Sequence, residues 1–122
     1  RAARGSDGRL YPWGNDAPTC NHAVYLGCAC PDGTCDVGTR TLDSSPYGAR
    51  DLAGNVWEWV QDWYHSSYVG APANGSAWED NGSSRVVWGG SFDFDASGLR
   101  ASFRYDVDPV GAGYGVGVRC CR

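Results

Sequence analysis

Four of the six cysteines crowd into one short stretch, and cysteine is the residue type here with the widest range of chemistry. Grouped cysteines form disulfides in an oxidising compartment or a metal site in a reducing one. Zinc fits poorly, because the spacing lacks paired C-x-x-C units and only two histidines could assist. We therefore predict disulfides, with Cys20–Cys28 and Cys30–Cys35 preferred among the three connectivities that the sequence leaves open.

Two carboxylates form a second chemical candidate, because Asp51 and Glu58 flank a glycine in the stretch DLAGNVWE. Calcium binds several hard oxygen ligands, which carboxylates and backbone carbonyls supply together. Acidic pairs are also common on solvated faces, where Asp51 would cap a turn and Glu58 would face water between two tryptophans. Spacing alone favours this solvated arrangement over a metal site.

Composition limits what the chain can bind. The 122 residues carry a net charge of −4 and no lysine, so no basic stripe is available for a nucleic-acid backbone. No run of about 18 apolar residues is present, so we expect no membrane insertion. Eighteen glycines with six tryptophans and seven tyrosines indicate a loop-rich single domain anchored by large rings.

Short strands must position these groups. The apolar alternation in 47–64 is typical of a strand, and shorter strands are predicted at 85–92, 99–105 and 113–121. A polar loop is expected over 65–84, and no amphipathic helix is evident. The sequence therefore predicts short antiparallel strands in long loops.

Four segments in this order resemble one family, the formylglycine-generating enzymes or sulfatase-modifying factors. They are AARGSDGRLYPWGN, SPYGARDLAGNVWEWVQDWY, RVVWGGSF, and LRASFR leading to GVGVRC. The resemblance implies an α+β fold similar to C-type lectins. It covers nearly all of 1–122 as one domain, except a Cys-rich insert at 20–36. In the family, AARG follows a sizeable N-terminal portion, so we expect this chain to be the C-terminal part.

The family's founding activity uses copper held by two cysteine thiolates, which the resemblance places between GGS and the LRxxxR segment. Here that stretch, Phe92 to Gly98, reads FDFDASG and holds no soft ligand. We therefore expect no copper, no catalytic residue and no enzymatic activity. Cys120 matches a cysteine that is structural in the family and pairs far upstream, outside this chain.

The resemblance also implies a calcium site. Matched residue by residue, side-chain oxygens would come from Asp51 and Glu58, and carbonyls from Leu52, Gly54 and Val56. Three arginines that recur in the family, at 100, 104 and 119, are expected to pair with Asp106 or Asp108.

A non-catalytic extracellular binding or structural module, secreted or periplasmic, follows from these expectations. Its partner would be a protein or glycan ligand, or else its own N-terminal portion or neighbouring subunits. Alternatives are a subunit of an extracellular assembly and a residual metal-dependent oxidoreductase-related domain acting with another domain. Aromatic rings suit recognition, although they would equally fill the core beside the tryptophans. The expected binding surface comprises Phe94, Phe103, Tyr105 and Tyr114.

Overall fold

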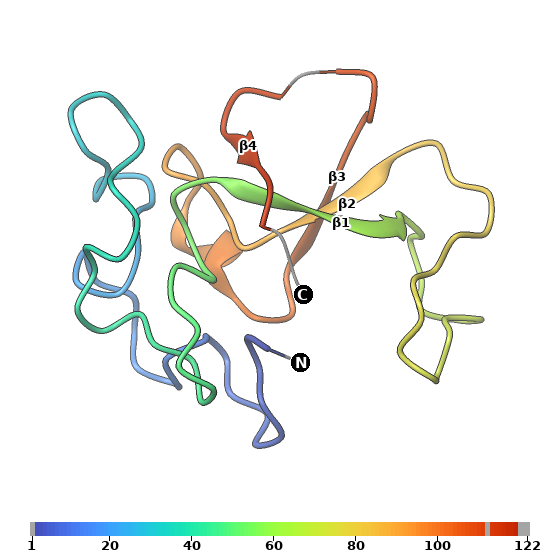
Figure 1. Ribbon diagram of the computed structural model, residues 1–122, viewed down its shortest axis with the longest axis horizontal. Coiled ribbons are helices and arrows are strands. Elements are labelled where there is room, and N and C mark those ends of the chain that lie inside the picture. Colours follow the sequence, from blue (N-terminus) through green and yellow to red (C-terminus); the bar gives the residue numbers. More distant parts are fainter. Residues whose placement is uncertain (1, 112, 120–122) are drawn as a thin grey trace.

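The computed structural model describes residues 2–111 and 113–119, and its centre is one four-stranded sheet (Figure 1). The strands are β1 (Trp57–Trp63), β2 (Arg85–Trp88), β3 (Arg104–Val107) and β4 (Val116–Gly117), in the spatial order β3-β2-β1-β4. Antiparallel ladders join β1 to β2 and β2 to β3. The β1–β4 pair is parallel, which differs from the antiparallel pairing expected throughout.

The strands are shorter than the sequence patterns indicated. The first ten residues of 47–64 form an irregular loop with one isolated bridge, between Gly54 and Val24, and the strand begins only at Trp57. The residues before Trp57 include Asp51, Gly54 and Asn55, all with positive φ, which a strand excludes. The strand expected over 99–105 begins instead at Arg104, because a 3-10 helix, η1 (Ala96–Leu99), precedes it.

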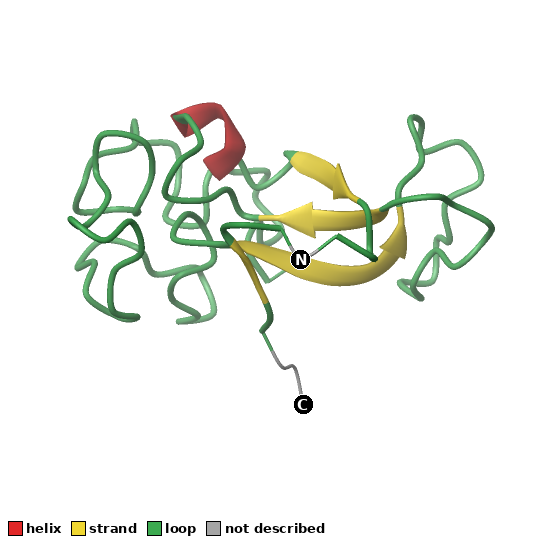
Figure 2. Ribbon diagram, turned by 90° about the horizontal axis from the view of Figure 1, so that it is seen from above, coloured by secondary structure: helices red, strands yellow, loops and turns green. Residues whose placement is uncertain are grey.

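Long loops flank the sheet at both ends, as predicted (Figure 2). The segment before β1 fills one end, and the loop between β1 and β2 extends from the other. Within the residues that the structure describes, η1 is the one helical segment. No helix in these residues is long and apolar enough to cross a membrane.

The core lies where the inner face of the sheet meets the N-terminal loops. Val87 and Leu99 are fully buried, and Trp57 is 6% exposed. Burying side chains of this size contributes roughly 1.5–3 kcal/mol each. Further contacts come from small buried residues, Ala23, Ala53 and Ala101, which let the loops approach closely.

Two disulfides hold the Cys-rich insert, Cys20–Cys28 and Cys30–Cys35, which is the preferred pairing. The insert packs against the segment that follows Gly90. Leu26 donates a backbone hydrogen bond of 3.0 Å to the carbonyl of Phe94. A Cβ on Gly33 would lie 2.9 Å from the ring of Phe92, and φ there is 96°, so a larger residue would be strained and would displace that ring. The insert therefore supports the segment expected to carry the binding surface.

Candidate functional site

The loop before β1 gathers most of the predicted calcium ligands around one cavity of about 450 Å³. Asp51, Gly54, Val56 and Glu58 all line it. Leu52 does not line the cavity. Its carbonyl oxygen lies close to Gly89, 3.2 Å from the position that a Cβ on Gly89 would take. No cluster of three or more acidic, histidine or cysteine side chains suited to a metal occurs in 2–111 or 113–119. Any cation here would depend on backbone carbonyls as well as carboxylates.

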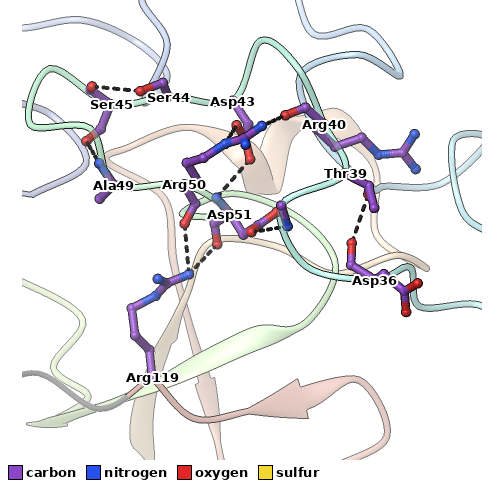
Figure 3. A network of polar contacts seen from close by, with 11 residues as sticks. Asp36, Thr39, Arg40, Asp43, Ser44, Ser45, Ala49, Arg50, Asp51 and Arg119 are labelled. Carbon is purple, nitrogen blue, oxygen red and sulfur yellow. Dashed lines mark hydrogen bonds and ion pairs between the residues drawn. The ribbon is translucent and has the colours of Figure 1, made fainter.

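A buried carboxylate fixes Asp51 (Figure 3). Asp43 is buried, accepts from the backbone nitrogen of Asp51 at 3.0 Å, and pairs with Arg50 Nε at 2.8 Å. The Asp51 side chain in turn accepts from the backbone nitrogen of Gly38 at 2.7 Å. These bonds hold Asp51 at a φ of 53°, a conformation that aspartate tolerates better than most residues.

Arg119 places a cation in the same cavity. Its Nε donates to both carboxylate oxygens of Glu58, at 2.9 and 3.1 Å. Its Nη2 donates to the carbonyls of Arg50 and Asp51, at 3.1 and 2.8 Å (Figure 3). The predicted pairing of Arg119 with Asp106 or Asp108 is therefore wrong. The parallel pairing of β4 with β1 sets Gly117 beside Glu58, and this brings Arg119 to the Glu58 carboxylate.

Opposing effects act on the Glu58 carboxyl. Burial raises its pKa, the charge and hydrogen bonds of Arg119 lower it, the nearby Asp51 charge raises it again, and the net direction is upward. A cation held close to a carboxylate in this setting stabilises its charged form. The cavity thus presents oxygens of the kind that calcium prefers, and the Arg119 guanidinium is in contact with both Glu58 oxygens and with the Arg50 and Asp51 carbonyls.

An aromatic cluster, defined as Trp57, Phe94, Phe103 and Tyr105, covers the inner face of the sheet near η1. The rings of Phe94, Phe103 and Tyr105 have centroids 5.2, 6.0 and 5.8 Å from that of Trp57. Trp57 is buried, whereas Tyr105 is 47% exposed. The cluster therefore runs from the core to the surface, with Trp57 at its buried end and Tyr105 at its exposed end.

Tyr114 lies outside this cluster. Its ring packs edge-on against Phe92 at 5.6 Å and is part of a residue that is 83% exposed. Three of the four residues of the expected binding surface thus lie together, and the fourth forms a separate pair. The prediction for Cys120 falls outside the described residues.

The segment Phe92–Gly98 has polar groups with local partners. Ser91 Oγ donates to Asp93 Oδ1 at 2.5 Å. Asp95 caps η1 and accepts from the backbone nitrogen of Ser97 at 2.7 Å. Both carboxylates therefore have hydrogen-bond partners two residues away in the sequence.

Sequence reasoning missed Asn55, which joins the insert to the loop before β1. Its side-chain amide pairs with the Cys35 backbone, accepting from the nitrogen at 2.9 Å and donating to the carbonyl at 3.1 Å. Asn55 has a φ of 70°, and asparagine is enriched in that region. The Gly-Asn pair was the available signal, but nothing in the sequence indicates its partner.

Comparison with known proteins agrees with this architecture. A formylglycine-generating enzyme from Thermomonospora curvata is 35% identical over 109 residues, covering 75% of this chain and 35% of that enzyme. One from Mus musculus is 30% identical over 128 residues, covering 95% of this chain and 34% of that enzyme. The solved structure of PvdO from Pseudomonas aeruginosa superposes with a TM-score of 0.82 at 28% identity, covering 96% of this chain and 46% of PvdO.

The chain thus spans about a third of the length of these two enzymes. The likeness to PvdO confirms the expected C-type-lectin-like fold with little regular secondary structure. The profile of the sulfatase-modifying factor enzyme 1-like domain matches residues 1–122. With the full chain matched and two relatives at 30% identity or more, this protein belongs to the family of sulfatase-modifying factor enzyme 1-like domains.

Proposed function

We propose that this chain is a non-catalytic binding or structural module of the sulfatase-modifying-factor type, stabilised by calcium and working in a secreted or periplasmic setting. The observation that carries the proposal is the composition of Phe92–Gly98. No cysteine occurs between Cys35 and Cys120, so this segment cannot supply the thiolate pair that copper requires. Its two aspartates are engaged locally, and Phe94 packs onto Trp57.

The first prediction concerns catalysis. Incubation of the protein with Cu(I) and a sulfatase-derived cysteine peptide is expected to yield no aldehyde, because no pair of thiolates is available at 92–98. Mass spectrometry of the peptide measures this directly, with the Thermomonospora curvata enzyme as positive control. Stoichiometric aldehyde would contradict the proposal. A double variant, Cys30→Ser with Cys35→Ser, would then show whether the insert is the source.

The exposed edge of the aromatic cluster is the proposed contact surface for a protein or glycan. Tyrosine offers a large contact area at low entropic cost, and Tyr105 combines a ring packed on Trp57 with a solvent-exposed side. Phe94 contributes from beneath it, at a centroid distance of 6.2 Å.

Separating folding from binding is the second prediction. Tyr105→Ala is expected to keep the fold and to lose binding to a panel of immobilised glycans and extracellular proteins. Tyr47→Ala is the control, since Tyr47 is also an exposed tyrosine, at 63% against 47% for Tyr105, and lies outside the cluster. Melting temperature and binding are measured on the same samples. If Tyr105→Ala unfolds the protein, or binds the panel as the parent does, the surface is not a contact site.

Calcium is proposed at the cavity lined by Asp51, Gly54, Val56 and Glu58. The ligand atoms that these four residues could offer are oxygens, which suit a hard cation, and Arg50 and Arg119 line the same cavity. Calcium bound there would add rigidity to the loop that enters β1. Since the guanidinium of Arg119 contacts Glu58 and the Asp51 carbonyl, calcium and Arg119 would compete for the same oxygens.

A further inference from the structure

A second cavity lies on the opposite face of the sheet from the aromatic cluster. It encloses about 330 Å³ between β1, β2 and the loop at 64–84. Ligand pockets in proteins are concave, mostly apolar and start at about this size. The walls of this cavity include the rings of Trp63, Tyr68, Trp78 and Trp88. Such walls favour a flat molecule that can stack on aromatic faces.

Strand register places a cation in this cavity. Trp88 pairs with Arg104 across β2 and β3, so both side chains emerge on one face of the sheet. The next pair, Val87 with Tyr105, points to the other face, where Tyr105 belongs to the aromatic cluster. The two surfaces therefore share strands but not side chains.

Arg104 is held in place without a carboxylate. Its guanidinium carbon lies 4.1 Å from the ring centroid of Tyr68 and 4.9 Å from that of Tyr64. Its Nη2 donates to the carbonyl of His65 at 2.5 Å. No acidic side chain in the described part of the chain lies within ion-pair distance of it, contrary to the expected pairing with Asp106 or Asp108. A half-buried, oriented guanidinium that retains free donors is suited to a carboxylate ligand.

The walls are fixed before any ligand arrives. His65 stacks on Trp78 at a centroid distance of 3.7 Å. Asp62 lines the cavity and accepts from the backbone nitrogen of Trp78 at 3.0 Å, which anchors the loop onto β1. The negative charge of Asp62 disfavours a second acidic group on the ligand. The other carboxylate oxygen of Asp62 can accept a hydrogen bond from a ligand hydroxyl.

We infer that this cavity binds a small monocarboxylate carried on a six-membered ring, with the carboxylate on Arg104 and one face of the ring against the tryptophans. An aromatic acid offers a flat ring face and a uronic acid the apolar C–H face of its sugar ring, so both share this chemistry. The inference does not depend on the aromatic cluster, so its failure would leave the proposed function of the other face intact.

Titration with two acids and their neutral counterparts tests the inference. Benzoate and glucuronate, against benzamide and glucose, are added up to about 10 mM, the weak range expected for ligands of this size. The indole N–H signals of the tryptophans are followed by NMR. At least one acid is expected to give saturable shifts while its neutral counterpart does not, and the acid that binds identifies the ring class. No saturation by either acid, or equal binding of a neutral counterpart, overturns the inference.

Variants assign the binding to this cavity. Arg104→Gln is expected to weaken the acid by about tenfold or more, the loss for a charge-assisted hydrogen bond. Arg100→Gln is the control, because Arg100 is an exposed arginine that does not line the cavity. Equal affinity for Arg104→Gln and the control would overturn the assignment.

A second variant covers a failure of Arg104→Gln to fold. Asp62→Asn keeps an oxygen that can accept from the Trp78 backbone nitrogen and removes the neighbouring negative charge. It is expected to tighten binding of the acid severalfold and to leave the neutral counterpart unchanged. An unchanged affinity for the acid would overturn the inference.

Discussion

Replacing Gly54 by alanine is expected to lower the free energy of unfolding by about 4 kcal/mol or more, enough to unfold much of the protein. Gly54 has a φ of 82°, and a Cβ there would run into the carbonyl oxygen of Val24 and lie 2.9 Å from its backbone nitrogen. These neighbours are backbone atoms that cannot rotate away. Gly54 also donates to the carbonyl of Gly89 at 2.7 Å, so the loop cannot shift without losing that bond.

Gly75 provides the matched control for this substitution. Its φ of 84° is almost the same, but a Cβ there would meet nothing within 4 Å. Gly75→Ala is therefore expected to cost only the backbone strain, about 1–2 kcal/mol. Urea denaturation of both variants measures the difference. Similar midpoints for Gly54→Ala and Gly75→Ala would contradict the close approach of the Gly54 loop to Val24.

The strands could be predicted where local pattern and burial agree. The sequence located both β1 and β2. Each of these strands is rich in apolar residues and pairs with another strand along both of its edges. The N-terminal boundary of β1 was wrong because Asn55 and Gly54 take up positive φ to meet Val24, a contact 30 residues away in sequence. Local propensity carries no information about such distant partners.

In the candidate site too, the sequence identified groups that are close together in the chain and missed those brought in by distant contacts. Type and spacing identified the carboxylates at 51 and 58, and the structure brings both to one cavity. The cation that joins them could not be predicted, because Arg119 reaches Glu58 through a parallel strand pair 61 residues away. Asp43 was also missed, since only its burial beneath Arg50 distinguishes it from a loop aspartate.

Calcium at this cavity leads to the other large expected effect. With calcium at about a hundred times its dissociation constant, binding to the folded state alone adds about 2.7 kcal/mol of stability. For a domain of this size, that corresponds to a rise in melting temperature of roughly 10 °C. Chelation with EDTA should remove this calcium-dependent increment in melting temperature. Differential scanning calorimetry with and without the ion measures the increment.

Three variants locate the ion. Glu58→Gln is expected to abolish the calcium-dependent increment, because it removes a carboxylate that lines the cavity. The only other glutamate, Glu79, accepts from Gln61 Nε2 at 2.9 Å and lies away from the cavity, so Glu79→Gln should keep the full increment. Arg119→Gln is expected to bind calcium more tightly than the parent, since the guanidinium no longer competes for Glu58 and the Asp51 carbonyl. An increment that survives in Glu58→Gln, or that is absent from the parent, would show that this cavity holds no calcium.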